Sequence, residues 1–233
     1  MRAVVAGLGL LLAACGPAQA PTVALRPPDP IPAPGHIAPG LVPLPCEETG
    51  PLRPVLGGYC VRQRHYVTDR AEKALQRAAK AVAAKHPGST VLFMEASWPT
   101  GVRPMPPHHS HGDGRQIDLA LFYADDAGRP LERPPTKSGY RASEPPRRES
   151  ERVCKGVRSA KNDWADPPAD RPWRLDETRT RDMIRVLSAD PAVRRIFLEP
   201  HLKTRLGFAR DPKVRFAGCR AARHDDHIHV DFR

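Results

Sequence analysis

Hydrophobic residues return at helical spacing in two parts of the chain. Over residues 70–85 an alanine, leucine or valine recurs every three or four positions, which predicts an amphipathic helix. Asp69 and Glu72 have the spacing of a capping box at its start, and His86-Pro87-Gly88 ends it. Residues 176–189 repeat the pattern, with an acidic start and an apolar face, and predict a second helix.

Shorter segments have the patterns of β-strands. Residues 90–96 are largely apolar, and residues 116–123 and 195–198 are short and apolar-rich. Residues 227–232 alternate strictly, so polar side chains share one face of a strand and apolar side chains share the other. The order of these elements predicts a small α+β domain, with a central antiparallel β-sheet and flanking helices. The polar face of the last strand carries His227, His229 and Asp231. If the apolar face packs on the core, this polar face should border a cleft.

The first residues have the features of an export signal. Arg2 precedes an apolar stretch that is too short to span a bilayer. The stretch runs into Leu12-Ala13-Ala14-Cys15, which resembles the lipobox of bacterial lipoproteins. We interpret residues 1–14 as a signal peptide and Cys15 as a lipid carrier, which predicts a periplasmic protein anchored to the outer membrane. The alternative is cleavage after Ala18-Gln19-Ala20, which also predicts export.

Residues 15–45 are rich in Pro and Ala and show no hydrophobic periodicity. Such a segment buries too little surface to fold alone, and we interpret it as a disordered tether behind the lipid anchor. Residues 46–233 are sufficient for one domain with its own core. Within that domain, residues 131–173 are polar, basic and Pro-rich, and a loop of this length is usually functional or disordered.

Setting Cys15 aside leaves four cysteines in a compartment that favours disulfides. Three pairings are open. We favour Cys46–Cys60, which closes a short loop, and Cys154–Cys219, which ties the long insertion to the C-terminal histidines. None of these cysteines forms a CxxC pair, so a metal site made of thiolates is disfavoured.

The chain carries a formal net charge of +11. A strongly basic protein suggests acidic partners, and nucleic acid is the usual first candidate. Export and the lack of a recognisable nucleic-acid-binding motif argue against nucleic acid here. Anionic polymers or lipid head groups of the cell envelope fit better, and a solvated basic surface without a specific partner is the alternative.

Six of the ten histidines lie in two short windows. If the strands that carry Asp118 and His229 are neighbours, these two side chains can bind one metal ion. His111 would then arrive from the turn before the first strand, across the flexible Gly112 and Gly114. Taken singly, Asp118 could be a lone carboxylate at a sheet edge, and an H-x-H pair is common by chance. The clustered histidines are His108, His109, His111, His224, His227 and His229.

Two motifs in these windows support a family resemblance. Ser110-His111-x-x-Gly114-x-x-x-Asp118, followed downstream by His224-Asp225-Asp226-His227-x-His229, resembles the penicillin-insensitive murein endopeptidases. With the lysostaphin-type and D-Ala-D-Ala peptidases they belong to the LAS group of zinc metallopeptidases, which implies the LAS or hedgehog-type peptidase fold. The resemblance covers about residues 108–123 and 224–230. Arg115-Gln116 and the basic insertion depart from the family's pattern, which puts the substrate pocket, rather than the metal site, in doubt.

The resemblance assigns roles to individual side chains. His227 would be a catalytic base that does not bind the metal, and His224 a further active-site histidine. His108 would lie just before the first ligand, and both His108 and Asp226 are candidates to orient a ligand or contact substrate. The ligands of one zinc ion per chain would be His111, Asp118 and His229. Asp226, Asp225 and Asp113 could also hold the far nitrogens of the bound histidines, or be solvated loop acids.

We therefore expect an exported zinc metallopeptidase that hydrolyses amide bonds in peptidoglycan cross-links. Its partners would be peptidoglycan and, through Cys15, the membrane, but not nucleic acid. A D,D-carboxypeptidase or dipeptidase acting on stem peptides is one alternative. A non-catalytic envelope-binding lipoprotein with a structural metal site is the other. An open fourth metal position would favour the enzymes, and a closed four-ligand site the binding protein.

Overall fold

The computed structural model describes residues 36–157 and 165–233. The predicted signal peptide, the lipidated Cys15 and most of the predicted tether lie outside the described residues. The helices are α1 (Gly58–Val61), α2 (Asp69–Lys85), α3 (Glu177–Ala189) and α4 (Pro200–Arg205), with a short 3-10 helix, η1, at Glu149–Glu151. The strands are β1 (Leu41–Pro43), β2 (Leu52–Pro54), β3 (Tyr66–Thr68), β4 (Val91–Phe93), β5 (Gln116–Ala120), β6 (Tyr123–Asp125), β7 (Trp173–Leu175), β8 (Val193–Phe197), β9 (Val214–Arg215) and β10 (His227–Phe232).

A six-stranded sheet in the order β2-β4-β5-β10-β8-β9 forms the centre of the fold. The pairs β4–β5, β5–β10 and β10–β8 are antiparallel, whereas the edge pairs β2–β4 and β8–β9 are parallel. The predicted α+β class is confirmed, but the prediction of an antiparallel sheet holds only for its centre. The edge strands β2 and β9 have three and two residues, too few for a hydrophobic pattern to reveal them.

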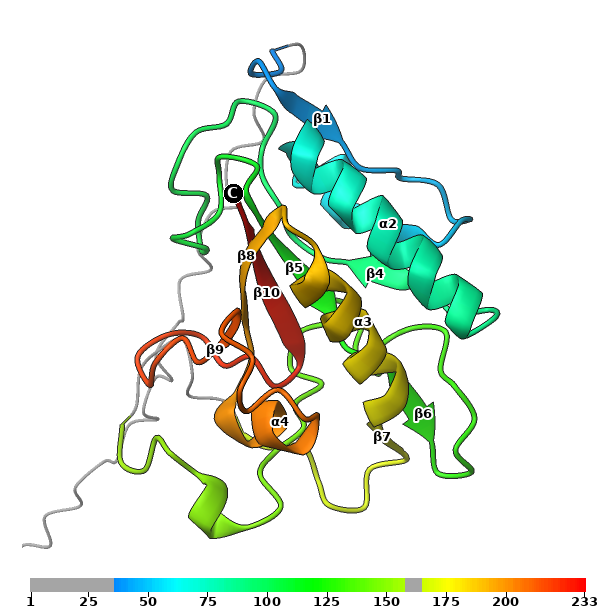
Figure 1. Ribbon diagram of the computed structural model, residues 1–233, viewed down its shortest axis with the longest axis vertical. Coiled ribbons are helices and arrows are strands. Elements are labelled where there is room, and N and C mark those ends of the chain that lie inside the picture. Colours follow the sequence, from blue (N-terminus) through cyan, green and yellow to red (C-terminus); the bar gives the residue numbers. More distant parts are fainter. Residues whose placement is uncertain (1–35, 158–164) are drawn as a thin grey trace, which may run out of the picture. The chain divides into compact units, whose positions relative to one another are not determined.

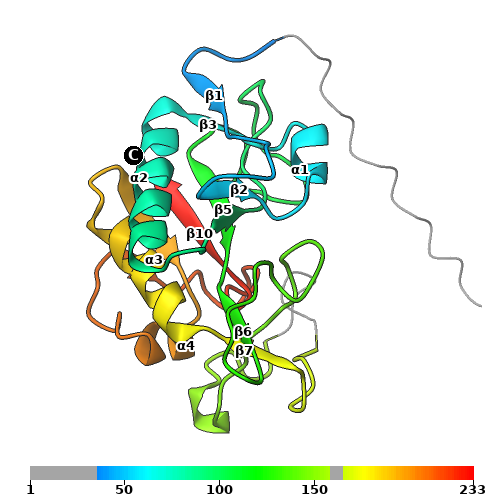
Figure 2. The ribbon, with the colours of Figure 1, turned by 90° about the vertical axis from the view of Figure 1, so that its right-hand side faces the viewer.

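The helices α2 and α3 lie side by side on one face of the sheet (Figures 1 and 2). The apolar face of β10 packs into the same buried cluster as the apolar faces of both helices. Because side chains alternate along a strand, the histidines of β10 are turned to the opposite face. The cluster includes Ile228, Val230, Ala71, Leu75 and Met183.

Both long helices begin within one residue of their predicted starts. The N-cap of α2 is Thr68, whose hydroxyl accepts a hydrogen bond from the backbone N–H of Ala71. The predicted capping box at Asp69 is therefore wrong by one residue, because Thr68, whose backbone is extended, is the residue that precedes the first turn of the helix. The helix α3 is capped by Asp176, which accepts a hydrogen bond from the N–H of Arg179.

Residues 41–44 belong to the fold, although the sequence interpretation places them in the tether. The strand β1 pairs antiparallel with β3, and Leu41 and Leu44 are buried. The strand β1 has only three residues, one of them Pro43, and it follows Pro39-Gly40, so its composition matches that of the tether. The folded domain therefore begins before residue 46.

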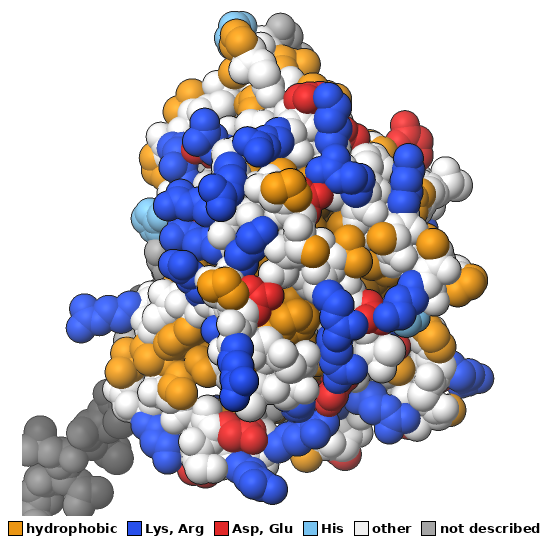
Figure 3. All heavy atoms as spheres, viewed as in Figure 1, with side chains coloured by type: hydrophobic (Ala, Val, Ile, Leu, Met, Phe, Trp, Pro, Cys, Tyr) orange, Lys and Arg blue, Asp and Glu red, His pale blue; other side chains and the backbone are white. Residues whose placement is uncertain are grey.

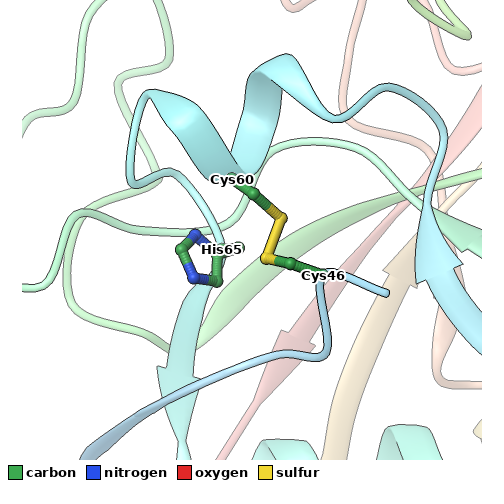
Figure 4. Close-up of side chains that lie close together, drawn as sticks. All are labelled: Cys46, Cys60 and His65. Atoms are coloured by element: carbon green, nitrogen blue, oxygen red, sulfur yellow. A yellow bond between two sulfur atoms is a disulfide. The ribbon is translucent and has the colours of Figure 1, made fainter. Parts of the chain in front are cut away.

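The structure forms both favoured disulfides, Cys46–Cys60 and Cys154–Cys219. The first lies beside His65 (Figure 4). Because the two sulfurs are bonded to each other, these three residues are not a thiolate metal site. The second attaches the loop of residues 131–157 to the segment that leads into β10.

Lys and Arg side chains are spread over the face that carries α2 and α3 (Figure 3). Acidic and apolar side chains lie between them, so the face is basic without being a patch of one charge. Within the two described ranges, no helix has both the length and the apolar character needed to cross a membrane.

Candidate metal centre

The two strands that carry the predicted ligands are neighbours. In the antiparallel pair of β5 and β10, Asp118 lies directly opposite His229, and Ala120 lies opposite His227. Residues directly opposite each other in a ladder point to the same face of the sheet. The juxtaposition of Asp118 and His229 on which the predicted site depends is therefore present.

Three polar atoms converge at this point of the sheet. The distance from His111 Nε2 to His229 Nδ1 is 3.1 Å. Asp118 Oδ1 lies 2.9 Å from His229 Nδ1 and 3.3 Å from His111 Nε2. Ligand atoms about 2.0–2.2 Å from a tetrahedral zinc ion lie roughly 3.3–3.6 Å from one another. The donor set and its spacing therefore fit a small divalent cation after a slight expansion.

Two of the three ligand atoms have the protonation state that metal binding requires. Burial lowers the pKa of His111, so its imidazole is neutral at neutral pH. Its Nδ1 lies 2.9 Å from the carbonyl oxygen of Ala96, so Nδ1–H donates there and Nε2 keeps a lone pair. Burial would raise the pKa of Asp118, but the charges and hydrogen bonds of neighbouring histidines hold it well below its usual value. A neutral imidazole and a carboxylate are the forms that bind cations.

His229 faces one carboxylate on each side of its ring. Its Nδ1 lies near Asp118, and its Nε2 lies 3.4 Å from Asp231 Oδ1. Burial would lower the pKa of His229, but its hydrogen bond to Asp118 and the neighbouring carboxylate of Asp231 raise it to about 9 without a cation. Asp231 in turn pairs with Arg195. Asp231, which shares the polar face of β10 with His229, is thus placed to hold the far nitrogen of that histidine.

The turn that delivers His111 is tightly packed rather than flexible. Gly112 has φ +137°, and a Cβ atom there would lie 2.3 Å from the carbonyl oxygen of Val102. Gly114 has φ +75°, and a Cβ atom there would lie 2.3 Å from Leu41 Cδ2. No L side chain fits either position without moving its neighbours. These glycines therefore hold His111 in place, and the interpretation of them as flexible is wrong.

His227 lies beside the three ligand atoms without joining them. Its Nε2 is 3.8 Å from Asp118 Oδ1, and its Nδ1 pairs with Asp226. Burial would lower the pKa of His227, but the charges of Asp226 and Asp118 raise it. Asp226 therefore orients the predicted base rather than a predicted ligand. The other two acids considered for that role bind elsewhere, Asp225 to Arg223 and Asp113 to Arg103.

His224 completes the histidine cluster at the start of β10. Its ring lies 4.9 Å from that of His227 and 5.7 Å from that of Phe197. Burial lowers its pKa well below the usual value, so the ring is neutral. Its Nδ1 has no hydrogen-bond partner among the described residues. A buried neutral imidazole with a free nitrogen is suited to bind a polar substrate group.

His108 offers a second possible set of ligands. His108, His111 and Asp118 have ligand atoms that all lie within 4.8 Å of one another, and this group could hold a metal ion. However, His108 Nε2 pairs with Glu95, and its Nδ1 is 3.7 Å from Asp118 Oδ2. The set with His229 is tighter, with no pair of atoms more than 3.3 Å apart. We therefore take His229, rather than His108, as the third ligand.

The sequence interpretation missed one residue of the centre altogether. The hydroxyl of Tyr140 donates a 2.6 Å hydrogen bond to Asp118 Oδ2. Burial and the charge of Asp118 raise the pKa of Tyr140 well above its usual value, so this hydroxyl stays protonated. Tyr140 lies in the long basic loop, and the only signal that could have found it was the length of that loop. Glu95, a buried acid just after β4, bridges His108 and Arg64.

The centre is enclosed rather than open. His111 and Asp118 are 0% and 1% exposed, and His227 and His229 are 4% and 5% exposed. The sequence predicted that the histidine face of β10 would border a cleft, but loop residues cover it. A cavity of about 440 Å³ borders the segment before β10 and is lined by residues that include Glu199, Arg223 and Asp225.

The strands β5 and β10, together with the segments that lead into each of them, thus bring together the seven candidate site residues that the sequence predicted. They are His108, His111, Asp118, His224, Asp226, His227 and His229. Compared with protein-family models and with curated proteins, the chain matches none of them.

Proposed function

We propose that this protein is a zinc-dependent peptidoglycan endopeptidase that hydrolyses amide bonds in murein peptide cross-links. One observation carries the proposal: His111 Nε2, Asp118 Oδ1 and His229 Nδ1 lie within 3.3 Å of one another, with His227 beside them. Three ligands with an unbound histidine nearby are typical of a catalytic zinc site, whereas structural sites use four protein ligands.

The chain's own residues suit amide hydrolysis. When bound, zinc supplies Lewis acidity that polarises the scissile carbonyl and lowers the pKa of water toward neutrality. Asp226 accepts the Nδ1 proton of His227, which leaves Nε2 facing the ligand atoms as the proton acceptor. The carboxylate of Asp226 also stabilises the imidazolium that this proton transfer creates. His224, neutral and next to His227, is placed to bind the substrate carbonyl or the leaving amine.

The choice of peptidoglycan depends on other features. The two motifs around His111 and His227 resemble those of the murein endopeptidases. The lipobox-like Cys15 and the Pro-rich segment suit an enzyme anchored in the cell envelope. The basic surface suits an anionic polymer as a neighbour.

Two other functions remain as alternatives. A D,D-carboxypeptidase or dipeptidase would use the same centre on a free stem peptide, and the enclosure of the histidines favours a small substrate. A binding lipoprotein would use the metal only for stability and would recruit a fourth protein ligand. His108 is the residue that could become that ligand, since its Nδ1 lies 3.7 Å from Asp118.

Digestion of purified, cross-linked peptidoglycan distinguishes these functions. The chain from Pro21 onward is incubated with zinc, with a chelator, and as the His227→Ala variant, and the products are identified by mass spectrometry. Loss of dimeric muropeptides that requires both zinc and His227 is the expected result. Release of terminal D-Ala alone would identify a carboxypeptidase. Bound zinc without any cleavage by a folded protein would favour the binding lipoprotein.

A further inference from the structure

The two oxygens of Asp118 have different surroundings. Oδ1 faces the nitrogens of His111 and His229, at 3.3 and 2.9 Å. Oδ2 accepts the 2.6 Å hydrogen bond from the hydroxyl of Tyr140. Asp118 is 1% exposed, so water does not compete with the phenol for this oxygen. One oxygen is therefore available to a cation, and the other is already occupied.

The backbone around Tyr140 is held from several sides. The hydroxyl of Thr136 donates to the carbonyl oxygen of Tyr140, at 2.8 Å, and the hydroxyl of Tyr59 donates to the carbonyl oxygen of Ser138, at 2.6 Å. Gly139 has φ +85°, and a Cβ atom there would lie 2.9 Å from Met94 Sδ. The phenol is thus presented to Asp118 by a fixed piece of backbone rather than by a loose loop.

The same short segment also reaches the predicted base. The backbone N–H of Arg141 donates to Asp226 Oδ2, the oxygen that does not contact His227. The ring of Tyr140 meets the ring of His227 edge-on, with centroids 5.1 Å apart and planes at 82°. Residues 140 and 141 therefore contact both carboxylates of the centre, one beside the ligand atoms and one behind the base.

We propose that Tyr140 is a positioning residue that restricts Asp118 to binding the metal through Oδ1 alone. This inference rests on the proposed metal centre. A carboxylate can bind a cation through one oxygen or through both. An oxygen that accepts a strong hydrogen bond is a poorer ligand, so the phenol keeps Oδ2 away from the cation. A catalytic zinc site needs this restriction, because a second oxygen would fill the position that water or substrate must occupy.

Tyr140→Phe tests the hydroxyl while keeping the ring against His227. The matched control is Tyr59→Phe, which also removes one phenolic hydrogen bond to this loop but none to Asp118. Cobalt(II) serves as the probe, since its visible absorption is several-fold stronger with four ligands than with six. Metal affinity is measured by competition with a chromophoric chelator, and circular dichroism confirms that each variant is folded.

The wild-type protein should bind cobalt(II) with the strong absorption of a four-coordinate ion. Tyr140→Phe should weaken metal affinity by about 10–100-fold, as for other partners that orient metal ligands, and weaken the absorption as the coordination number rises. Tyr59→Phe should lose far less in both, because the hydrogen bond between Tyr140 and Asp118 remains. Identical affinity and spectra for Tyr140→Phe and wild type would overturn the inference, as would the same losses in Tyr59→Phe.

Neither readout depends on catalysis, so the two proposals can fail separately. A wild-type protein that binds no metal would overturn both. A wild-type protein that binds metal and cleaves no peptidoglycan would overturn the proposed function alone, and the contrast between Tyr140→Phe and Tyr59→Phe would still decide the role of Tyr140.

Discussion

The β5–β10 pair and the loop of residues 131–157 contribute to the same centre in different ways. The strands place Asp118 opposite His229 through a regular ladder, and the side chains follow from simple alternation. The loop contributes Tyr140 and the N–H of Arg141 through an irregular path without a repeating pattern. The comparison teaches that Asp118 and His229, two of the three proposed ligands, meet through regular structure, whereas Tyr140, which orients Asp118, reaches it through irregular structure.

Removing a ligand should have the largest effect. Asp118→Asn replaces the only carboxylate among the three ligand atoms with a neutral amide, a far weaker ligand for a divalent cation. We expect loss of stoichiometric zinc, measured by elemental analysis, and hydrolysis no greater than that of chelator-treated wild type. His109→Ala, at an exposed neighbouring histidine, is the control and should retain both. Zinc retained at full occupancy in Asp118→Asn would contradict the assigned ligand set.

Weakening the packing of β10 against the core should lower the stability of the whole domain. Ile228 is fully buried on the face of β10 that packs against the helices. Ile228→Ala should lower the free energy of unfolding by about 2–5 kcal/mol, because it removes apolar contacts and leaves a cavity. Urea denaturation measures the change. A loss below about 1 kcal/mol would show that the core rearranges around the smaller side chain.

A change in the loop should affect the centre more than the fold. Gly139→Ala places a Cβ atom 2.9 Å from Met94 Sδ at a position with φ +85°, and such strain costs about 1–3 kcal/mol. We expect weaker metal affinity, because the strained segment carries Tyr140, and a fall in the free energy of unfolding no larger than this strain. Chelator competition and urea denaturation of the same sample check both. Equal metal affinity in variant and wild type would show that the loop is not coupled to the centre.

The smallest effect should be a pH dependence of the contact between loop and core. His201 in α4 is buried, and its Nε2 lies 2.7 Å from the carbonyl oxygen of Glu144 in the loop. Burial lowers the pKa of His201 in the folded state. Its stabilising contribution is therefore present above the unfolded pKa of about 6.5 and is lost as pH falls toward the folded value.

His201→Gln isolates this contribution from that of other titrating groups. The difference in unfolding free energy between wild type and variant should shrink between pH 7.5 and pH 5, at about 1.4 kcal/mol for each unit by which the pKa is lowered. Urea denaturation at the two pH values measures it. A difference that stays constant or grows as pH falls would show that His201 is not held in its neutral form.

Several features of the fold could be predicted because they depend on neighbouring residues. Alternation over residues 227–232 predicted β10 with its observed bounds and placed His227, His229 and Asp231 on one face. Helical periodicity predicted α2 and α3 to within one residue at their starts. Local patterns also singled out His111 and Asp118, although the use of these residues as ligands stays a prediction.

Other features depend on residues far apart in the chain, and only the tertiary structure decided them. Tyr140, which donates to Asp118 Oδ2, lies 22 residues from Asp118 in the sequence. Arg141, which donates to the oxygen of Asp226 that does not contact His227, lies 85 residues from Asp226. The direction of the edge strands β2 and β9 depends on how the chain crosses the sheet rather than on their few residues. The sequence by itself determined which side chains share a face, because that follows from backbone geometry. Tertiary structure decided which faces meet and which loop covers them, because that depends on packing over the whole domain.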